Sequence, residues 1–111
     1  MHDWIVIYES ANKDWFNEFK KNMEERIANG FTHGEWADLA EGEFATCVQN
    51  FMNDQDGFMC AHWRSESEDA IHKQLEANGY ANTIHYVIYR INHFGSAFMP
   101  RDEKVLWTSD Q

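Results

Sequence analysis

The apolar positions of the chain recur in two rhythms, which predict alternating strands and helices. Residues 4–8 form a short apolar run rich in β-branched side chains, typical of a buried central strand. From Trp15 to Ile27, apolar residues recur at three- and four-residue steps, as on one face of a helix. Asn29-Gly30 then ends this helix, because glycine takes the left-handed conformation of a helix C-terminus without steric cost.

A second helix is predicted over residues 32–53. Thr32 and Glu35 have the spacing of a capping box, which satisfies free backbone amides at a helix start. An apolar stripe with helical spacing follows: Trp36, Leu39, Ala40, Phe44, Cys47, Val48, Phe51 and Met52. Gly42 interrupts this helix and weakens it by about 1 kcal/mol relative to alanine. Residues 54–57 predict a turn and residues 58–63 a second strand.

The rest of the chain predicts one more helix and two strands. Ser65 and Glu68 repeat the capping-box spacing and open a third helix that ends at residues 78–79. Residues 84–91 and 104–108 predict strands, with a loop or ragged edge strand between them. The order β-α-α-β-α-β-β predicts an α/β (α+β) two-layer sandwich: about four strands in a mixed sheet, three helices, and an antiparallel hairpin formed by the last two strands.

Length and composition fit one compact domain over residues 1–111. The chain is 43% hydrophobic and 15% aromatic, which is enough to fill a core and excludes disorder as the main state. Two cysteines, Cys47 and Cys60, are too few for a disulfide scaffold, so we expect buried thiols in a reducing compartment, although a bridge between them stays open. Without a signal sequence or a membrane-length apolar run, the expected location is the cytoplasm.

The charge is strongly negative and unevenly distributed. With 19 acidic residues against 9 lysines and arginines, the net charge of −10 argues against direct binding of nucleic acid or anionic membranes. No lysine or arginine occurs between Arg26 and Arg64, and six carboxylates lie in this stretch: Glu35, Asp38, Glu41, Glu43, Asp54 and Asp56. The first three are three residues apart and would line one helix edge. Such a surface is either an ordinary solvated face or one that presents carboxylates to a basic partner in place of phosphates.

Motifs for metals, cofactors or catalysis are weak. No histidines or cysteines have the spacing of a zinc site, and the aspartates at 54 and 56 lack the other acidic positions of a calcium loop, so we expect no metal and no cofactor. A glycine-rich phosphate loop and a nucleophile elbow are also missing from the sequence. Glu9 at a strand end could meet His62 or His85 from neighbouring strands as an acid–base pair.

These patterns favour a small acidic binding protein over an enzyme. It would occlude the Lys/Arg-rich cleft of a basic nucleic-acid-handling partner, a nuclease toxin or a host defence nuclease or polymerase, as an immunity protein or a virus-encoded inhibitor does, with the six carboxylates as the partner-binding surface. One alternative is a small enzyme or ligand-binding module with a strand-end pocket around Glu9, His62 and His85. Another is a self-associating structural subunit in which Trp4 and Trp107 are buried against a second copy, so the protein is expected as a monomer or a homodimer.

Overall fold

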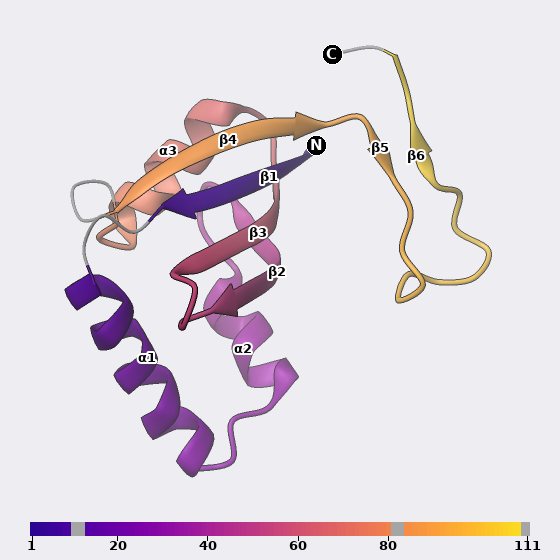
Figure 1. Cartoon of the computed structure of the whole chain (residues 1–111). Helices are drawn as coiled ribbons and strands as arrows, with labels where there is room; N and C mark the ends of the chain where they lie inside the picture. The colour runs from indigo at the N-terminus through magenta and orange to yellow at the C-terminus, as the bar shows by residue number, and fades with distance from the viewer. Residues whose placement is uncertain (10–12, 81–83, 110–111) are drawn as a thin grey trace.

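The computed structural model describes residues 1–9, 13–80 and 84–109 of the chain (Figure 1). Four strands form one sheet: β1 (His2–Glu9), β2 (Thr46–Asn53), β3 (Phe58–Ser65) and β4 (His85–Ile91). Two short strands, β5 (His93–Phe94) and β6 (Leu106–Trp107), form a separate hairpin. The helices are α1 (Lys13–Ala28), α2 (His33–Ala40) and α3 (Glu68–Ala77).

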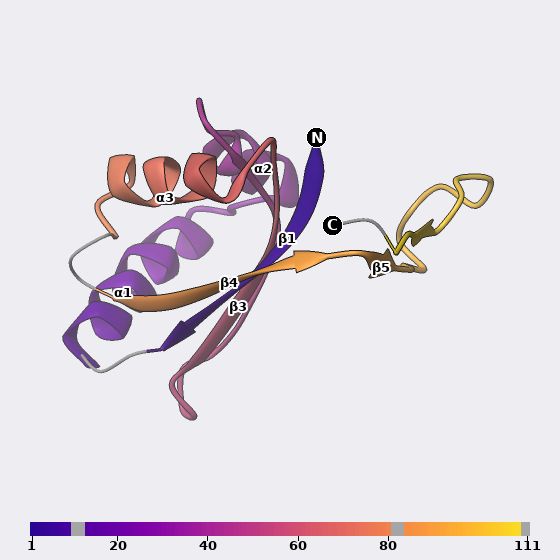
Figure 2. The same ribbon diagram turned by 90° about the horizontal axis from the view of Figure 1, so that it is seen from above.

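The three helices lie on one face of the four-stranded sheet, so the domain has two layers (Figure 2). The strand order is β2-β3-β1-β4, and every pair is antiparallel. The connection through α1 and α2 passes over β3, and the connection through α3 passes over β1, which is the split β-α-β, or ferredoxin-like, plan. The predicted sandwich of four strands and three helices is confirmed, but the sheet is antiparallel instead of mixed, because each helical connection skips one neighbouring strand.

The hydrophobic core lies between the two layers. Successive residues of a strand point to opposite faces of a sheet, and Val6, Tyr8, Ala61 and Trp63 face the helices and are buried. The helices contribute further buried side chains to the same cluster: Phe16, Ile71 and Leu75. The strand order places β1 between β3 and β4, so the prediction of a central first strand is confirmed, but the predicted burial on both of its faces is wrong, because Ile5 and Ile7 are only partly buried.

The long second helix predicted as far as Asn53 was wrong. α2 ends at Ala40, Glu41 follows with an extended backbone (φ −70°, ψ 116°), and residues 46–53 form the additional strand β2. The helix-like spacing in this segment arises because β2 carries apolar side chains on both faces and contains a β-bulge between Cys47 and Gln49. The bulge adds one residue to the strand, so its apolar pattern loses the simple two-residue period.

The predicted helix starts are confirmed for α2 and shifted for α3. The Thr32 hydroxyl accepts a hydrogen bond from the Glu35 amide (3.1 Å), and the Glu35 carboxylate accepts one from the Thr32 amide, which completes the capping box. At α3 the N-cap is Ser67, whose hydroxyl accepts from the Ala70 amide at 3.2 Å. Ser65 instead ends β3, where it is paired with His2 of β1, and its hydroxyl donates to the Ser67 carbonyl oxygen.

The C-terminal hairpin formed by β5 and β6 extends beyond the end of β4, away from the helices (Figures 1 and 2). It confirms the prediction of a final antiparallel hairpin, although the partner of the last strand is β5 and not β4. The rings of His93 and Trp107 stack within the hairpin, with their centroids 3.9 Å apart. Phe94 contacts His62 of the sheet at a centroid distance of 4.9 Å, so one end of the hairpin is attached to the sheet surface.

Candidate functional site

The six carboxylates of the predicted partner-binding surface do not form one row. All six are exposed and lie in three places: Glu35 and Asp38 in α2, Glu41 and Glu43 in the segment that follows it, and Asp54 and Asp56 in the turn between β2 and β3. The expectation of carboxylates along one edge of a long helix was wrong, because α2 ends at Ala40.

Three of these carboxylates have partners. Asp54 Oδ2 lies 2.9 Å from Lys20 Nζ of α1, and this hydrogen-bonded ion pair holds the pKa of Asp54 below its ordinary value. Asp56 accepts a hydrogen bond from Asn53, and Glu35 belongs to the capping box. Within the described ranges, the side chains left without a hydrogen-bond or ion-pair partner are Asp38, Glu41 and Glu43. Residues 27–63 contain no lysine or arginine, but Lys20 of α1 folds against this stretch and neutralises Asp54.

The negative charge is separated by layer. Residues 35–43 carry four carboxylates and no lysine or arginine, and residues 66–77 carry four carboxylates and one lysine. The four strands of the sheet contain two acidic and two basic residues: Asp3, Glu9, Arg64 and Arg90. The helical layer is therefore acidic, whereas the strands are neutral overall.

The predicted acid–base group at the strand ends is only half assembled. Glu9 and His85 are paired across β1 and β4, with 3.9 Å between Oε2 and Nδ1, and both are exposed. His62 pairs with Ile5 in the register of β1 and β3, which places it toward the other end of the sheet. The structure therefore brings Glu9 to His85 but not to His62.

His62 belongs instead to a polar cluster with Asp3 and Arg64. Asp3 Oδ1 accepts from His62 Nε2 at 2.8 Å and from Arg64 Nε at 3.0 Å. Partial burial alone would raise the pKa of Asp3, but these two hydrogen bonds outweigh it and hold the pKa below its ordinary value. Asp3 is thus an ionised carboxylate held between two donors, and these hydrogen bonds connect the beginning of β1 to β3.

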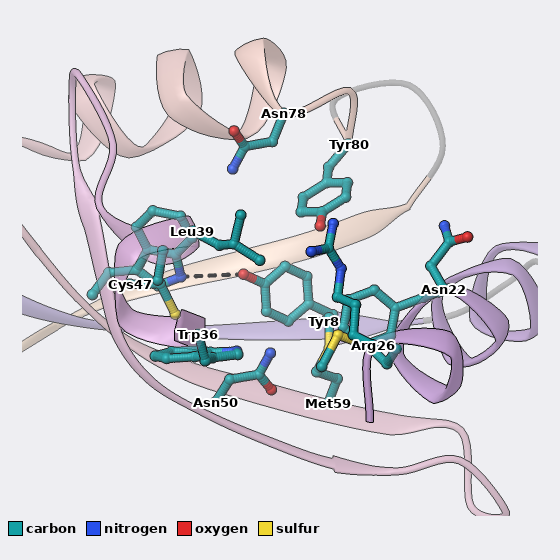
Figure 3. Close-up of a pocket in the computed structure, with 14 residues that line it drawn as sticks. Tyr8, Asn22, Arg26, Trp36, Leu39, Cys47, Asn50, Met59, Asn78 and Tyr80 are labelled. Carbon is teal, nitrogen blue, oxygen red and sulfur yellow. Dashed lines mark hydrogen bonds between the residues drawn. The ribbon is translucent and has the colours of Figure 1, made fainter. Parts of the chain in front are cut away.

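A cavity of about 370 Å³ lies between the helical layer and the sheet, under α1 and α2 (Figure 3). It exists because only the first half of α1 contacts the core: Phe16 is buried, whereas Ile27 near the end of the helix is 62% exposed. The second half of α1 thus stands off the sheet. Trp36 and Leu39 of α2 close one side of the space, and Met59 of β3 lies at its floor.

The described polar groups around this cavity are one guanidinium, amides and hydroxyls, whereas carboxylates dominate the charged groups of the chain as a whole. Figure 3 shows the Arg26 side chain reaching from α1 toward the middle of the cavity. Amides and hydroxyls surround it: Asn22, Asn50, Asn78, Tyr8 and Tyr80. Of the described residues that line the cavity, none is an aspartate or a glutamate.

Arg26 is also the one lining group that is charged at neutral pH within the described part of the chain. Burial raises the pKa of Tyr8 and of Tyr80, and it raises the pKa of Cys47 to about 12. The Tyr8 hydroxyl accepts a hydrogen bond from Trp63 Nε1 at 3.1 Å. Because thiolates and not thiols act as nucleophiles, Cys47 is not activated for covalent chemistry, and the cavity is suited to binding.

Both cysteines are free, and they lie on opposite faces of the sheet. Cys47 is paired with Trp63, whose side chain faces the helices, whereas Cys60 is paired with Ile7, which faces the other way. Among the residues with described positions, no three His, Cys, Asp or Glu side chains gather as metal ligands would. No described helix is long and apolar enough to cross a membrane.

No protein-family model, curated protein or solved structure matches the chain. The candidate site therefore stands on its own geometry. The sequence did not point to Arg26, Trp36 or Asn50 as members of one site. The available signals were Asn22 and Arg26 at helical spacing on α1 and a polar residue, Asn50, on the inner face of a strand.

Proposed function

We propose that this protein binds a small anionic compound in the cavity under α1 and α2. The observation that carries the proposal is the reversal of charge: in a chain of net charge −10, the described lining has one guanidinium and no carboxylate. Arg26 is an exposed residue that lines this partly open cavity, and its positive charge favours an anion there. The volume of about 370 Å³ falls within the range of small-molecule sites.

The lining also favours a particular kind of anion. Trp36, Leu39 and Met59 form apolar walls, which favour a ligand with an aromatic or branched apolar body. A carboxylate matches the planar guanidinium of Arg26, because the two groups can form paired hydrogen bonds. The proposed ligand is thus a small monocarboxylate with an apolar body, oriented by the surrounding amides and hydroxyls.

Titration calorimetry with probes of one shape and different charge tests this proposal. Benzoate and 3-phenylpropanoate are expected to bind more tightly than the corresponding amides, and the corresponding amines are expected not to bind. Arg26→Gln should weaken carboxylate binding by about tenfold or more, since hydrogen bonds between charged groups contribute about 1.5–3 kcal/mol.

The matched control for this experiment is Lys21→Gln. Lys21 is exposed on the same helix and does not line the cavity. The control removes the same charge and should leave carboxylate affinity unchanged. Equal binding of carboxylate and amine probes, or equal losses in both variants, would contradict the proposal.

We also propose a second binding function, for which the supporting observation is the set of unpaired carboxylates at the end of α2 and in the segment that follows it. Asp38, Glu41 and Glu43 are exposed and lie in a stretch without lysine or arginine. In this proposal they engage the Lys/Arg-rich cleft of a basic, nucleic-acid-handling protein, such as a nuclease, in the positions that phosphates occupy. An acidic surface accelerates such encounters, and added salt slows them.

Two charge-matched variants test this second function. Glu41→Lys combined with Glu43→Lys should abolish capture of a basic protein from a cell lysate at low salt. Glu18→Lys combined with Glu25→Lys changes the net charge equally on α1 and should leave capture intact. If the amount of captured partner changed neither with added salt nor in the Glu41→Lys/Glu43→Lys variant, the acidic surface would not be its binding site.

A further inference from the structure

The sheet face opposite the helices, which we call the open face, carries apolar side chains. Phe51, Phe58 and Tyr89 point to this side and are 52%, 45% and 55% exposed. Partly buried apolar residues lie between them: Ile5, Ile7, Cys60 and Val87. An exposed apolar patch of this extent marks an interaction surface on soluble proteins.

Described elements cover the open face at one end only. There the C-terminal hairpin meets the cluster of Asp3, His62 and Arg64, with Phe94 against His62 and a cavity of about 300 Å³ between hairpin and sheet. The other described segments leave the centre of the face uncovered (Figure 2).

We propose that a second copy of this chain covers the open face, with the two sheets packed face to face about a two-fold axis. Charge favours a copy as the occupant. Two molecules of net charge −10 repel each other, and the repulsion is weakest where the surface itself is neutral. The charged residues of the open face are Asp3, Glu9 and Arg64, which leaves one net negative charge, because Arg90 is paired with Trp4 and faces the helical side. The helical layer holds most of the negative charge.

Arg64, the basic residue of the open face, is already paired within its own copy. Its Nε lies 3.0 Å from Asp3 Oδ1 at one end of the face, whereas Glu9, whose side chain is 68% exposed, lies at the other end. A two-fold axis that lies between the two sheets and perpendicular to the strands places the Glu9 end of each copy over the Asp3–Arg64 end of its partner. This arrangement keeps the exposed Glu9 carboxylates of the two copies apart.

The area of the open face, including the end where the hairpin meets it, is close to the smallest size of a specific interface. Four strands of about eight residues, with a rise of about 3.4 Å per residue and a spacing of about 4.8 Å, cover about 500 Å² per copy. The total of about 1,000 Å² reaches the lower bound for a specific interface.

Sedimentation equilibrium between about 1 and 100 µM tests the proposal. The wild-type chain of 13.1 kDa should sediment with twice that mass at the upper concentration. Phe51→Lys combined with Tyr89→Lys should sediment as a monomer, because four lysines would then face each other across the interface. Ile27→Lys combined with Leu39→Lys, at equally exposed apolar positions of the helical layer, should remain dimeric. A wild-type monomer at 100 µM, or a control variant that dissociates as fully, would overturn the proposal.

Alkylation of the wild-type thiols provides a second measurement that needs no variant. Cys60 lies on the open face, whereas Cys47 lies under the helices. Dimerisation should slow the reaction of Cys60 with iodoacetamide by about fivefold or more between 1 and 100 µM protein. Cys47, read from the peptide masses, should react slowly at both concentrations. A rate for Cys60 that does not change with protein concentration would equally overturn the proposal.

Discussion

The two faces of the sheet have similar side chains and opposite surroundings. On β1, Val6 is fully buried under the helices, whereas its neighbours Ile5 and Ile7 are only partly buried on the open face. In most antiparallel sheets with one solvated face, polarity alternates together with burial. In the middle of β1, burial alternates and polarity does not, and the charged residues Asp3 and Glu9 of the same face lie at the strand ends. A strand that is apolar on both sides predicts a partner for each side, and the helices of one chain supply only one of them.

The two layers differ as clearly in charge. The helical layer carries carboxylates around a cavity whose described lining contains one cation, whereas the strands carry equal numbers of acids and bases. The proposed ligand site thus lies under the helical layer, and the proposed dimer interface lies on the open face. They can be tested separately.

Truncation of neighbouring side chains on β3 gives the largest expected difference between the faces. Met59 is buried against the helices, and Phe58 beside it is on the open face. Met59→Ala should lower the free energy of unfolding by about 3 kcal/mol, because it leaves a cavity in the core. Phe58→Ala should cost less than about 1 kcal/mol in urea denaturation at a protein concentration low enough to keep the chain monomeric. Equal losses would mean that the open face is already covered within one chain.

Two glycines of the helical layer give the next largest effect. A methyl group at Gly42 would collide with the Ala45 carbonyl oxygen and with the buried side chain of Gln74, whose Oε1 accepts from the Phe44 amide at 2.9 Å. Gly42→Ala should therefore destabilise the protein by about 2 kcal/mol. At Gly34 in α2, the nearest atom is 3.8 Å away, so Gly34→Ala should stabilise by up to about 1 kcal/mol in thermal denaturation. If Gly42→Ala left the free energy of unfolding unchanged, the segment after α2 would be loosely packed.

Acid titration of the polar end of the open face gives the smallest effect. Since the folded-state pKa of Asp3 is lowered below its ordinary value of 3.8, its ionised form adds stability above about pH 4, and this contribution is lost as the pH falls through the folded-state pKa. Asp3→Asn should cost about 1 kcal/mol at pH 7 and progressively less as the pH falls through the folded-state pKa of Asp3, measured by urea denaturation. A cost that is the same at both pH values would mean that the carboxylate charge is unimportant at this position.

Local patterns predicted those parts of the fold that depend on neighbouring residues. The first helix, the central first strand and the capping box at Thr32 follow from spacing and caps, and the structure has them. β2 was missed because its bulge and its two apolar faces imitate a helical period. The acidic row depended on that helix, so it was wrong for the same reason.

Most of the candidate site could not be predicted, because its members meet only through the fold. Arg26, Asn50 and Tyr80 come from α1, β2 and the segment after α3, and sequence spacing says nothing about their proximity. The two tryptophans expected at a self-association surface also separate. Trp4 is buried on the helical side and donates to the Ser65 carbonyl oxygen at 3.3 Å, while Trp107 is exposed in the hairpin.

The bulge in β2 has a consequence for how copies of this chain can aggregate. β2 is an outer strand, and a regular outer strand offers unpaired backbone groups on which a further strand can add, the first step toward fibrils. The irregularity between Cys47 and Gln49 breaks that ladder, as bulges do at many natural sheet margins. The addition of a further strand to the β2 edge is hindered there. Packing of two sheets face to face does not use this edge, so the bulge does not hinder it.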